Sequence, residues 1–291
     1  MDSFKIEAFL TALDLGSISA AGNFLGYTQP GITRIIRSLE DEMGFDLLVR
    51  TKKGVVITEN GKTMLPLFRE IVHASNNALE LSGSIKGVLS GTLVIGSYYS
   101  VSSMLLPEVI KTFKTHYPGI RIRIHEGGNR DFAKWLQNKS VDCCFAIQPA
   151  DGVSCDWIPI LQDEMMVWLH SDHPLAGNSS YPLEELENEL YIATSPDEDT
   201  EIDRMLQKEN IKPTSVFSTA NAYTAYRMVE AGLGVSVNDK LFTDRWDGDV
   251  VALPFTSPQK ITLGISVPSL KEASPATKKF IECVKESFTL Q

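Results

Sequence analysis

Strand-like and helix-like segments alternate from residue 91 to residue 291, and this order restricts the fold more than any other feature of the sequence. The strands are short apolar runs such as TLVIGS at residues 92–97 and VDCCFAI at residues 141–147, with helical patterns such as RDFAKWLQNK between them. Such alternation predicts βα units on largely parallel sheets. The segment is long enough for two small α/β subdomains, whose ligand sites lie where strand ends meet helix N-termini.

The N-terminal region has a different pattern. Apolar residues three and four apart predict helices over residues 4–13, 18–25 and 29–43. The third helix begins after Thr28, carries Pro30 in its first turn and ends at Gly44, which are typical start and stop residues. Two short helices joined by a tight turn form a helix-turn-helix, in which the second helix inserts its N-terminal end into the major groove.

The polar face of the third helix carries hydrogen-bond donors in its first two turns, namely Gln29, Thr33, Arg34 and Arg37, whereas its acidic residues lie in the last turn. Arginine can donate two hydrogen bonds to guanine and glutamine can bond to adenine, while the threonine methyl group can contact thymine. This face is therefore predicted to read DNA. The alternative is a solvated polar face on a protein-interaction helix.

Residues 47–58, LLVRTKKGVVIT, predict a hairpin whose tip carries basic residues suited to phosphate. A helical pattern then runs from Thr58 to about Leu81, followed by a Gly- and Ser-rich linker at residues 82–91. The apolar stripe of this helix is narrow and favours pairing with a second helix, here a second copy of the chain. Its members are Met64, Phe68, Ile71, Ser75, Ala78 and Ser82.

Composition excludes several classes of protein. The net charge is −10, which argues against a protein that coats nucleic acid with its whole surface. There is no uncharged apolar stretch of about 18 residues and no signal peptide, so we expect a cytoplasmic protein without a membrane partner.

The chemistry-bearing residues do not form an enzyme motif. Cys143, Cys144, Cys155 and Cys283 have neither disulfide-framework nor zinc spacing, so they are expected to be core residues, with redox sensing by an exposed one as the alternative. The histidine pair in HSDHP lacks further metal ligands, and no nucleophile elbow or phosphate-binding motif occurs. We therefore predict no metal, no cofactor and no enzymatic activity.

Two long segments carry a family resemblance. FLTALDLGSISAAGNFLGYTQPGITRIIRSLEDEMGFDLLVR at residues 9–50 and VITENG at residues 56–61 resemble the winged helix-turn-helix and linker helix of the LysR-type transcriptional regulators. DHPLA at residues 172–176, EAGLGVSV at residues 230–237 and the order of elements resemble the effector domain of that family. The implied fold is α/β with an N-terminal winged helix-turn-helix, a long linker helix and a two-lobed, periplasmic-binding-protein-like effector domain.

The resemblance also implies boundaries. The winged helix-turn-helix would occupy residues 1–58, the linker helix and hinge residues 59–90, and the effector domain residues 91–291. Lobe I would take about residues 91–163 and 266–291, and lobe II about residues 164–265. The two chain crossings between the lobes are expected near residues 162–166 and 263–267.

Effector-binding residues are expected at strand ends. In GSYYSVSSMLLP, residues 96–107, a strand ends and serines gather at the next helix start, where a carboxylate would fit the positive helix end. The resemblance places effectors at this strand end, although serines there can also be simple helix caps. The candidate effector-binding residues are Ser97, Ser100, Ser102, Ser103, Gln148, Thr194, Ser195, Asn221, Tyr223 and Asn238.

The family likeness implies a homodimer, formed through the linker helix and assembling into a tetramer, that binds double-stranded DNA at a dyad-symmetric site. A small-molecule effector, such as a carboxylate, would control it, and RNA polymerase would be a further partner. Two alternatives stay open: an α/β binding protein or enzyme with a helical assembly segment, and a regulator with a vestigial cleft that responds to redox or to a partner. The DNA-facing residues implied are Thr28, Gln29, Pro30, Thr33, Arg34, Arg37, Arg50, Lys52 and Lys53.

Overall fold

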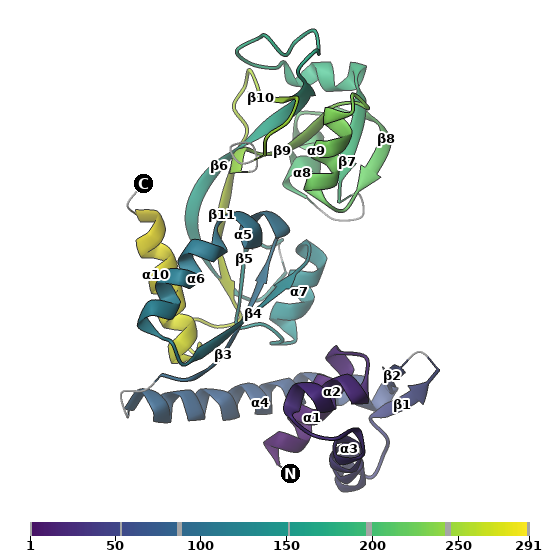
Figure 1. Ribbon diagram of the computed structural model, residues 1–291, viewed down its shortest axis with the longest axis vertical. Coiled ribbons are helices and arrows are strands. Elements are labelled where there is room, and N and C mark those ends of the chain that lie inside the picture. Colours follow the sequence, from purple (N-terminus) through teal and green to yellow (C-terminus); the bar gives the residue numbers. More distant parts are fainter. Residues whose placement is uncertain are drawn as a thin grey trace. The chain divides into compact units, whose positions relative to one another are not determined.

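The chain divides into two compact units in the computed structural model, which describes residues 2–52, 54–85, 89–150, 152–195, 200–241 and 246–289 (Figure 1). The first unit comprises Met1–Gly91 with Asn138–Ser140, and the second comprises Thr92–Gln137 with Val141–Gln291. Within the described ranges, no helix is both long enough and apolar enough to cross a membrane.

The first unit contains the predicted helices and hairpin. Its core joins α1 to α4 through Phe9 and Phe68, which are fully buried and whose ring centroids lie 5.6 Å apart. The hairpin pairs Leu48 with Ile57 and Thr51 with Gly54. The elements are α1 (Ser3–Asp14), α2 (Ile18–Leu25), α3 (Gln29–Met43), β1 (Leu48–Thr51), β2 (Gly54–Ile57) and α4 (Glu59–Ile85).

The long helix α4 corrects one expectation. Phe68 belongs to the core of the N-terminal domain, and Met64 and Ile71 pack against that core, so the predicted stripe is largely used within its own chain. A neighbouring heptad stripe lies mostly at the surface: Ile71, which belongs to both stripes, packs partly against the core, whereas Leu67 and Leu81 are each 54% exposed and Ile85 is 80% exposed. The stripe, named here the outer seam, consists of Leu67, Ile71, Ala74, Ala78, Leu81 and Ile85.

The second unit begins with a lobe built on a sheet that has helices on both faces (Figure 1). Successive side chains of β5 point to opposite faces: Phe145 lies 6.2 Å from the Phe288 ring of α10, whereas Cys144 packs with Phe132 of α7. The elements of this lobe are β3 (Gly91–Ser97), α5 (Tyr99–Met104), α6 (Leu106–His116), β4 (Ile120–Glu126), α7 (Asn129–Gln137), β5 (Cys143–Ile147) and α10 (Pro275–Thr289).

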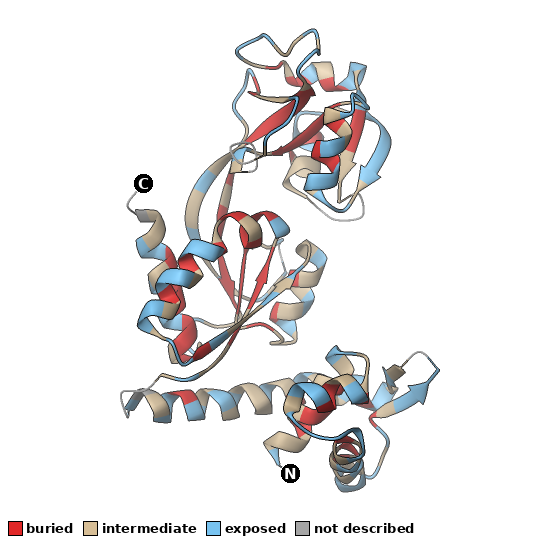
Figure 2. Cartoon of the chain, viewed as in Figure 1, coloured by how far each residue is buried: buried red, intermediate tan, exposed pale blue. Residues whose placement is uncertain are grey.

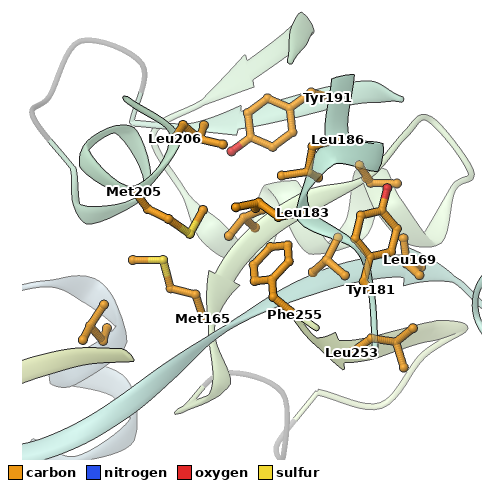
Figure 3. Close-up of a cluster of buried hydrophobic side chains, with 14 residues drawn as sticks. Met165, Leu169, Tyr181, Leu183, Leu186, Tyr191, Met205, Leu206, Leu253 and Phe255 are labelled. Carbon is orange, nitrogen blue, oxygen red and sulfur yellow. The ribbon is translucent and has the colours of Figure 1, made fainter. Parts of the chain in front are cut away.

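The second lobe has its own core, which Figure 3 shows in close-up. Tyr181 and Phe255 are buried there with ring centroids 6.3 Å apart, and Figure 2 shows that burial follows its central strands. The elements are η1 (Leu183–Asn188), β7 (Leu190–Thr194), α8 (Glu201–Lys208), β8 (Thr214–Thr219), α9 (Ala222–Glu230), β9 (Ser236–Asp239) and β10 (Val250–Pro254).

Two long strands, β6 (Asp156–His170) and β11 (Lys260–Val267), connect the lobes. The first half of β6 pairs antiparallel with β11, and its second half pairs with β9 and β10. The sequence predicted a pair of strands over this region, but β6 is a single strand. The seven-stranded sheet therefore has the order β10-β6-β11-β5-β3-β4, with β9 also beside β6, and it is mixed rather than largely parallel, because β6 and β11 run in opposite directions.

The crossings can be located from this pairing. The outgoing crossing falls near Glu164 and Met165, within the range expected. The return crossing lies nearer Lys260 than the expected residues 263–267, because Leu263 already pairs with Ile147 of the first lobe.

Candidate functional site

The first candidate surface is the outward face of α3. Thr28 caps this helix, and its Oγ1 accepts a hydrogen bond from the amide of Gly31 at 3.3 Å. Gln29, Arg34 and Arg37 are exposed along the next two turns. The N-terminal part of α3 therefore presents hydrogen-bond donors to solvent, and Pro30 lies exposed in the first turn.

Two of the three carboxylates of α3 are engaged away from this face, whereas Asp41 is exposed one turn beyond Arg37. Glu40 Oε1 accepts hydrogen bonds from the amides of Leu47 and Leu48 at 2.8 and 3.1 Å. Glu42 pairs with Lys5 Nζ at 2.5 Å, which lowers the pKa of its carboxyl group. Glu40 and Glu42 thus brace the last turn of the helix against its neighbours, and the exposed Asp41 lies at the C-terminal end of the donor face, beyond its first two turns.

The hairpin contributes basic groups beside α3. Arg50 Nη2 donates a hydrogen bond to Thr33 Oγ1 at 2.8 Å, which links the hairpin to the half-buried threonine of the helix. Lys52 is exposed at the turn. Lys53, the third basic residue predicted here, lies outside the described residues.

Gly54 seats the hairpin on the turn that follows α1. The amide of Val55 donates to the carbonyl oxygen of Gly16 at 3.0 Å, and Gly54 has φ +127. A Cβ atom at position 54 would lie 2.2 Å from the Gly16 oxygen, so a side chain would displace the hairpin.

The second candidate site is a cavity of about 540 Å³ between the two lobes of the second unit. The loops after β3, β4 and β5 line it from one lobe, and the ends of β7, β8 and β9 line it from the other. Its volume is in the range that holds small metabolites. Ser100 and Asn238, which are 5% and 4% exposed, are its most buried polar residues.

The charged side chains that line this cavity are all acidic. Four carboxylate side chains line it, and none of its described lining residues is lysine or arginine. Burial, together with the neighbouring carboxylates of Asp163 and Glu201, raises the pKa of Asp239 to about 7. The expectation of a carboxylate effector conflicts with this lining, because like charges would meet in a partly desolvated space. The four acids are Glu126, Asp131, Glu201 and Asp239.

Comparison with protein families decides the identity. The model described as LysR substrate binding domain matches residues 86–289, and the model described as Bacterial regulatory helix-turn-helix protein, lysR family, matches residues 4–62. The chain belongs to the LysR family of transcriptional regulators. It is a DNA-binding regulator with an effector-binding domain, and its partners are DNA and a small-molecule effector.

Relatives of this LysR-family regulator match along nearly its whole length. The uncharacterized HTH-type transcriptional regulator YvbU of Bacillus subtilis (strain 168) is 29% identical over 287 residues, which cover 98% of each chain. A full-length variant of OxyR from Pseudomonas aeruginosa has a TM-score of 0.77 at 22% identity and covers 100% of this chain and 98% of its own. The effector binding domain of QuiR in complex with shikimate has a TM-score of 0.63 at 20% identity and covers 69% of this chain and 99% of its own.

Five of the ten effector residues predicted for this regulator line the cavity. Asn221 Oδ1 caps α9 by accepting from the amides of Tyr223 and Thr224 at 2.9 and 3.2 Å. Ser195 has φ +51, a conformation that non-glycine residues adopt rarely and mostly at turns and functional sites. The five that line the cavity are Ser100, Thr194, Ser195, Asn221 and Asn238.

The other predicted serines of the first lobe make hydrogen bonds within that lobe. Ser97 Oγ donates to the carbonyl oxygen of Tyr98 at 3.0 Å. Ser103 Oγ donates to the carbonyl oxygen of Tyr99 at 2.7 Å, and Ser102 Oγ donates to the same oxygen at 3.1 Å and to the Glu126 carboxylate. Hydroxyl groups in a helical turn, such as those of Ser102 and Ser103, commonly bond to the backbone in this way. All three serines are absent from the lining.

Gln148 and Tyr223 are also absent from the lining. Gln148 follows β5 but is exposed. The Tyr223 ring stacks against Tyr226 with centroids 6.5 Å apart and contacts Trp246 at 5.1 Å, so it belongs to an aromatic cluster on α9.

Sequence reasoning missed the acidic wall and the tyrosines beside Ser100. Glu126 and Asp239 are the last residues of their strands, and Glu201 is the first residue of a helix, so the strand-end rule that selected the serines could also have found these acids. The missed polar lining residues are Tyr98, Tyr99, Glu126, Asn129, Asp131, Thr200, Glu201 and Asp239.

Proposed function

We propose that this regulator reads base edges with the first two turns of α3 and holds the DNA backbone with its hairpin. The observation that carries this proposal is the exposed donor face of Gln29, Arg34 and Arg37, in the first turns of α3, where the helix has no carboxylate. Thr28 and Pro30 lie at the tip of the same helix, and Thr33 lies between the arginines and the hairpin. Arg50, Lys52 and Lys53 supply charge to phosphates, which position the protein without carrying sequence information.

We further propose that the DNA-binding domains pair through α4. The outer seam repeats apolar residues at the four-and-three spacing of a coiled coil, and most of it is exposed. A homodimer holds two recognition helices at once and fits a dyad-symmetric site, and two such dimers form the proposed tetramer. From the family likeness we also propose that the regulator contacts RNA polymerase at the promoter. The protein would then act in the cytoplasm, where the DNA is.

Control is proposed to come from a small molecule in the 540 Å³ cavity, acting as a ligand and not as a substrate. A ligand shifts the regulator only if it binds one arrangement better than another. The rival of a vestigial cleft is less well supported, because the space is open and has buried polar groups on its wall. Redox control is also less well supported, because burial raises the pKa values of Cys143, Cys144, Cys155 and Cys283 and disfavours their reactive thiolates.

DNA selection tests the first part of the proposal. Sites are selected from a random duplex library with the full-length protein and compared with those selected by the Arg34→Ala/Arg37→Ala double variant. We expect a dyad-symmetric consensus for the wild type and no enrichment for the double variant. Enrichment by the double variant of the same consensus would exclude α3 as the reading helix.

Sedimentation tests the pairing. Leu81→Glu places a charge on the outer seam and is expected to give monomers that bind DNA weakly, because two half-sites are no longer held together. Leu79→Glu is the matched control, since Leu79 is 69% exposed on the same helix but off the seam. Equal behaviour of the two variants would reject the outer seam as the interface.

A further inference from the structure

The walls of the effector cavity carry acids from both lobes, and these acids point to the ligand class. Glu126 ends β4 and Asp131 lies in the first turn of α7, both in the first lobe. Glu201 begins α8 and Asp239 ends β9, both in the second lobe. Four carboxylates thus face one space from four different elements.

Little positive charge in the described lining offsets them. Glu201 Oε1 pairs with Arg204 Nη1 at 2.9 Å. Glu126 receives a hydrogen bond from Ser102, and Asp131 Oδ2 accepts one from the amide of Gly128 at 3.4 Å. Among the described residues, none donates a hydrogen bond to the Asp239 side chain, so the wall retains net negative charge.

Buried acceptors inside the same cavity give a second, independent indication. The hydroxyl group of Ser100, a residue only 5% exposed, has no hydrogen-bond partner within the described part of the chain. Asn238 Nδ2 donates to Ser236 Oγ at 3.1 Å, and Ser236 Oγ donates in turn to the carbonyl oxygen of Ile192 at 2.9 Å. This chain of bonds leaves the Asn238 Oδ1 atom as an acceptor. Both oxygen atoms are accessible from the cavity, and a ligand with N–H groups can donate hydrogen bonds to them.

The carboxylates and these acceptors together select the chemistry. A carboxylate group on the ligand would face like charges in this space, whereas an ammonium or guanidinium group can make charge-assisted hydrogen bonds to the walls. In the described ranges, no three His, Cys, Asp or Glu side chains are grouped so that they could hold a metal ion, which favours an extended organic ion over a metal. Tyr98 and Tyr99 also line the cavity, and aromatic rings are favourable neighbours for such a group.

We propose that the cavity of this regulator binds an organic cation, an amine or guanidine of small-metabolite size, which bridges the acids of the two lobes. This inference rests on the proposal that the cavity is the effector site. Without the cation, acids on opposite walls repel one another and favour separated lobes. With it, both walls bind the same molecule, so the closed arrangement is the one that the ligand stabilises.

Calorimetric titration of the full-length protein with matched four-carbon compounds tests the ligand class. The probes are butane-1,4-diamine, its monoguanidine derivative, the neutral butane-1,4-diol and the dianion butanedioate. We expect at least one of the two cations to bind one per chain, while the diol and the dianion do not bind. Binding of butanedioate in preference to the cations, or binding of neither cation at millimolar concentration, would overturn the inference.

Single substitutions locate the binding. Asp239→Asn and Asp131→Asn each remove a wall charge with little change in shape and are expected to weaken cation binding about tenfold, which is the loss of one hydrogen bond to a charged group. Glu184→Gln, an exposed residue outside the lining, is the charge-matched control and should change the affinity less than twofold. Equal cation affinity in all three variants would show binding outside the cavity and would overturn the inference.

DNA selection distinguishes failure of the cation inference from failure of the proposed regulatory function. Each wall variant is first shown to select the same DNA consensus as the wild type, which also establishes that it folds. A protein that selects DNA but binds butanedioate remains a regulator with a different effector class. A protein that binds the cation in the cavity but selects no DNA contradicts the proposed function instead.

Discussion

The donor face of α3 and the cavity of the effector domain have opposite chemistry. The first two turns of α3 expose Gln29, Arg34 and Arg37, all of which can donate hydrogen bonds. The cavity is concave, and its wall is built from carboxylates and buried acceptors. A chain with a net charge of −10 therefore still provides a site for a polyanion, because local placement and not total charge decides what binds.

The two sites also differ in how they are built. One helix, its caps and a hairpin create the donor face, so it depends on contacts that are near in sequence. The cavity needs strand ends and helix starts that lie far apart along the chain. This difference predicts that the two sites can be damaged separately, and the tests below begin with the largest expected effect.

Phe9→Ala is expected to disrupt the N-terminal domain alone. The change removes a fully buried ring that packs on Phe68, at a cost of about 3–5 kcal/mol. Scanning calorimetry should show a lowered first transition, with loss of DNA binding and retained cation binding. Phe280→Ala, which removes a buried ring beside Phe113 in the effector domain, should do the reverse. A joint shift of all transitions in both variants would show that the units unfold together.

Arg34→Ala should reduce affinity for the selected site by about 1–3 kcal/mol and relax the preference at one base position in each half-site. The measurement is binding to the site and to its single-base variants across a salt series. Arg121→Ala, an exposed arginine on β4, removes the same charge elsewhere and should keep the sequence preference. If Arg34→Ala changes only the salt dependence, this residue contacts phosphate and not bases.

The stability of the effector domain should fall as the pH rises from about 4 to about 7. The folded protein raises the pKa of Asp239 from 3.8 to about 7, through burial and the nearby carboxylates of Asp163 and Glu201. In this range the folded state holds more protons than the unfolded chain, so deprotonation favours unfolding. The effect is expected on the order of 1 kcal/mol because the side chain is partly exposed. Thermal unfolding of Asp239→Asn should show a flatter pH profile, and Glu184→Gln should keep the slope of the wild type.

Lys52→Ala should have the smallest effect. A lysine at the hairpin that contacts one phosphate contributes to all sequences alike, so the salt slope should fall by about one unit while the ratio of specific to nonspecific binding stays constant. Filter binding to the selected site and to a scrambled duplex measures both quantities. A selective loss on the scrambled duplex or on the selected site would contradict a role limited to phosphate.

Local signals predicted the N-terminal domain well. Thr28 caps the start of α3 and the left-handed Gly44 ends it, and the helix runs from Gln29 to Met43 between them. The prediction that the apolar stripe of α4 pairs with a second copy failed in part. The spacing of apolar residues shows which face of a helix is buried but not which partner covers it. Met64 and Phe68 pack within their own domain, and the outer seam lies about one residue earlier in the repeat.

The effector domain shows where local signals stop. The sequence suggested a pair of strands through residues 158–171, but β6 is one continuous strand because this segment passes from one lobe to the other. Ser102 and Ser103 looked like ligand groups, yet one helical turn directs their hydroxyls to backbone carbonyls.

The sequence by itself determined the order of elements, the caps of α2 and α3, the donor face and the family, because each depends on neighbouring residues or on a continuous motif. Only the tertiary structure decided that Glu126, Asp131, Glu201 and Asp239 line one cavity and that half of the predicted effector residues do not. The physical reason is that the cavity forms where two lobes meet, so its charge depends on side-chain directions and long-range packing that no local pattern encodes.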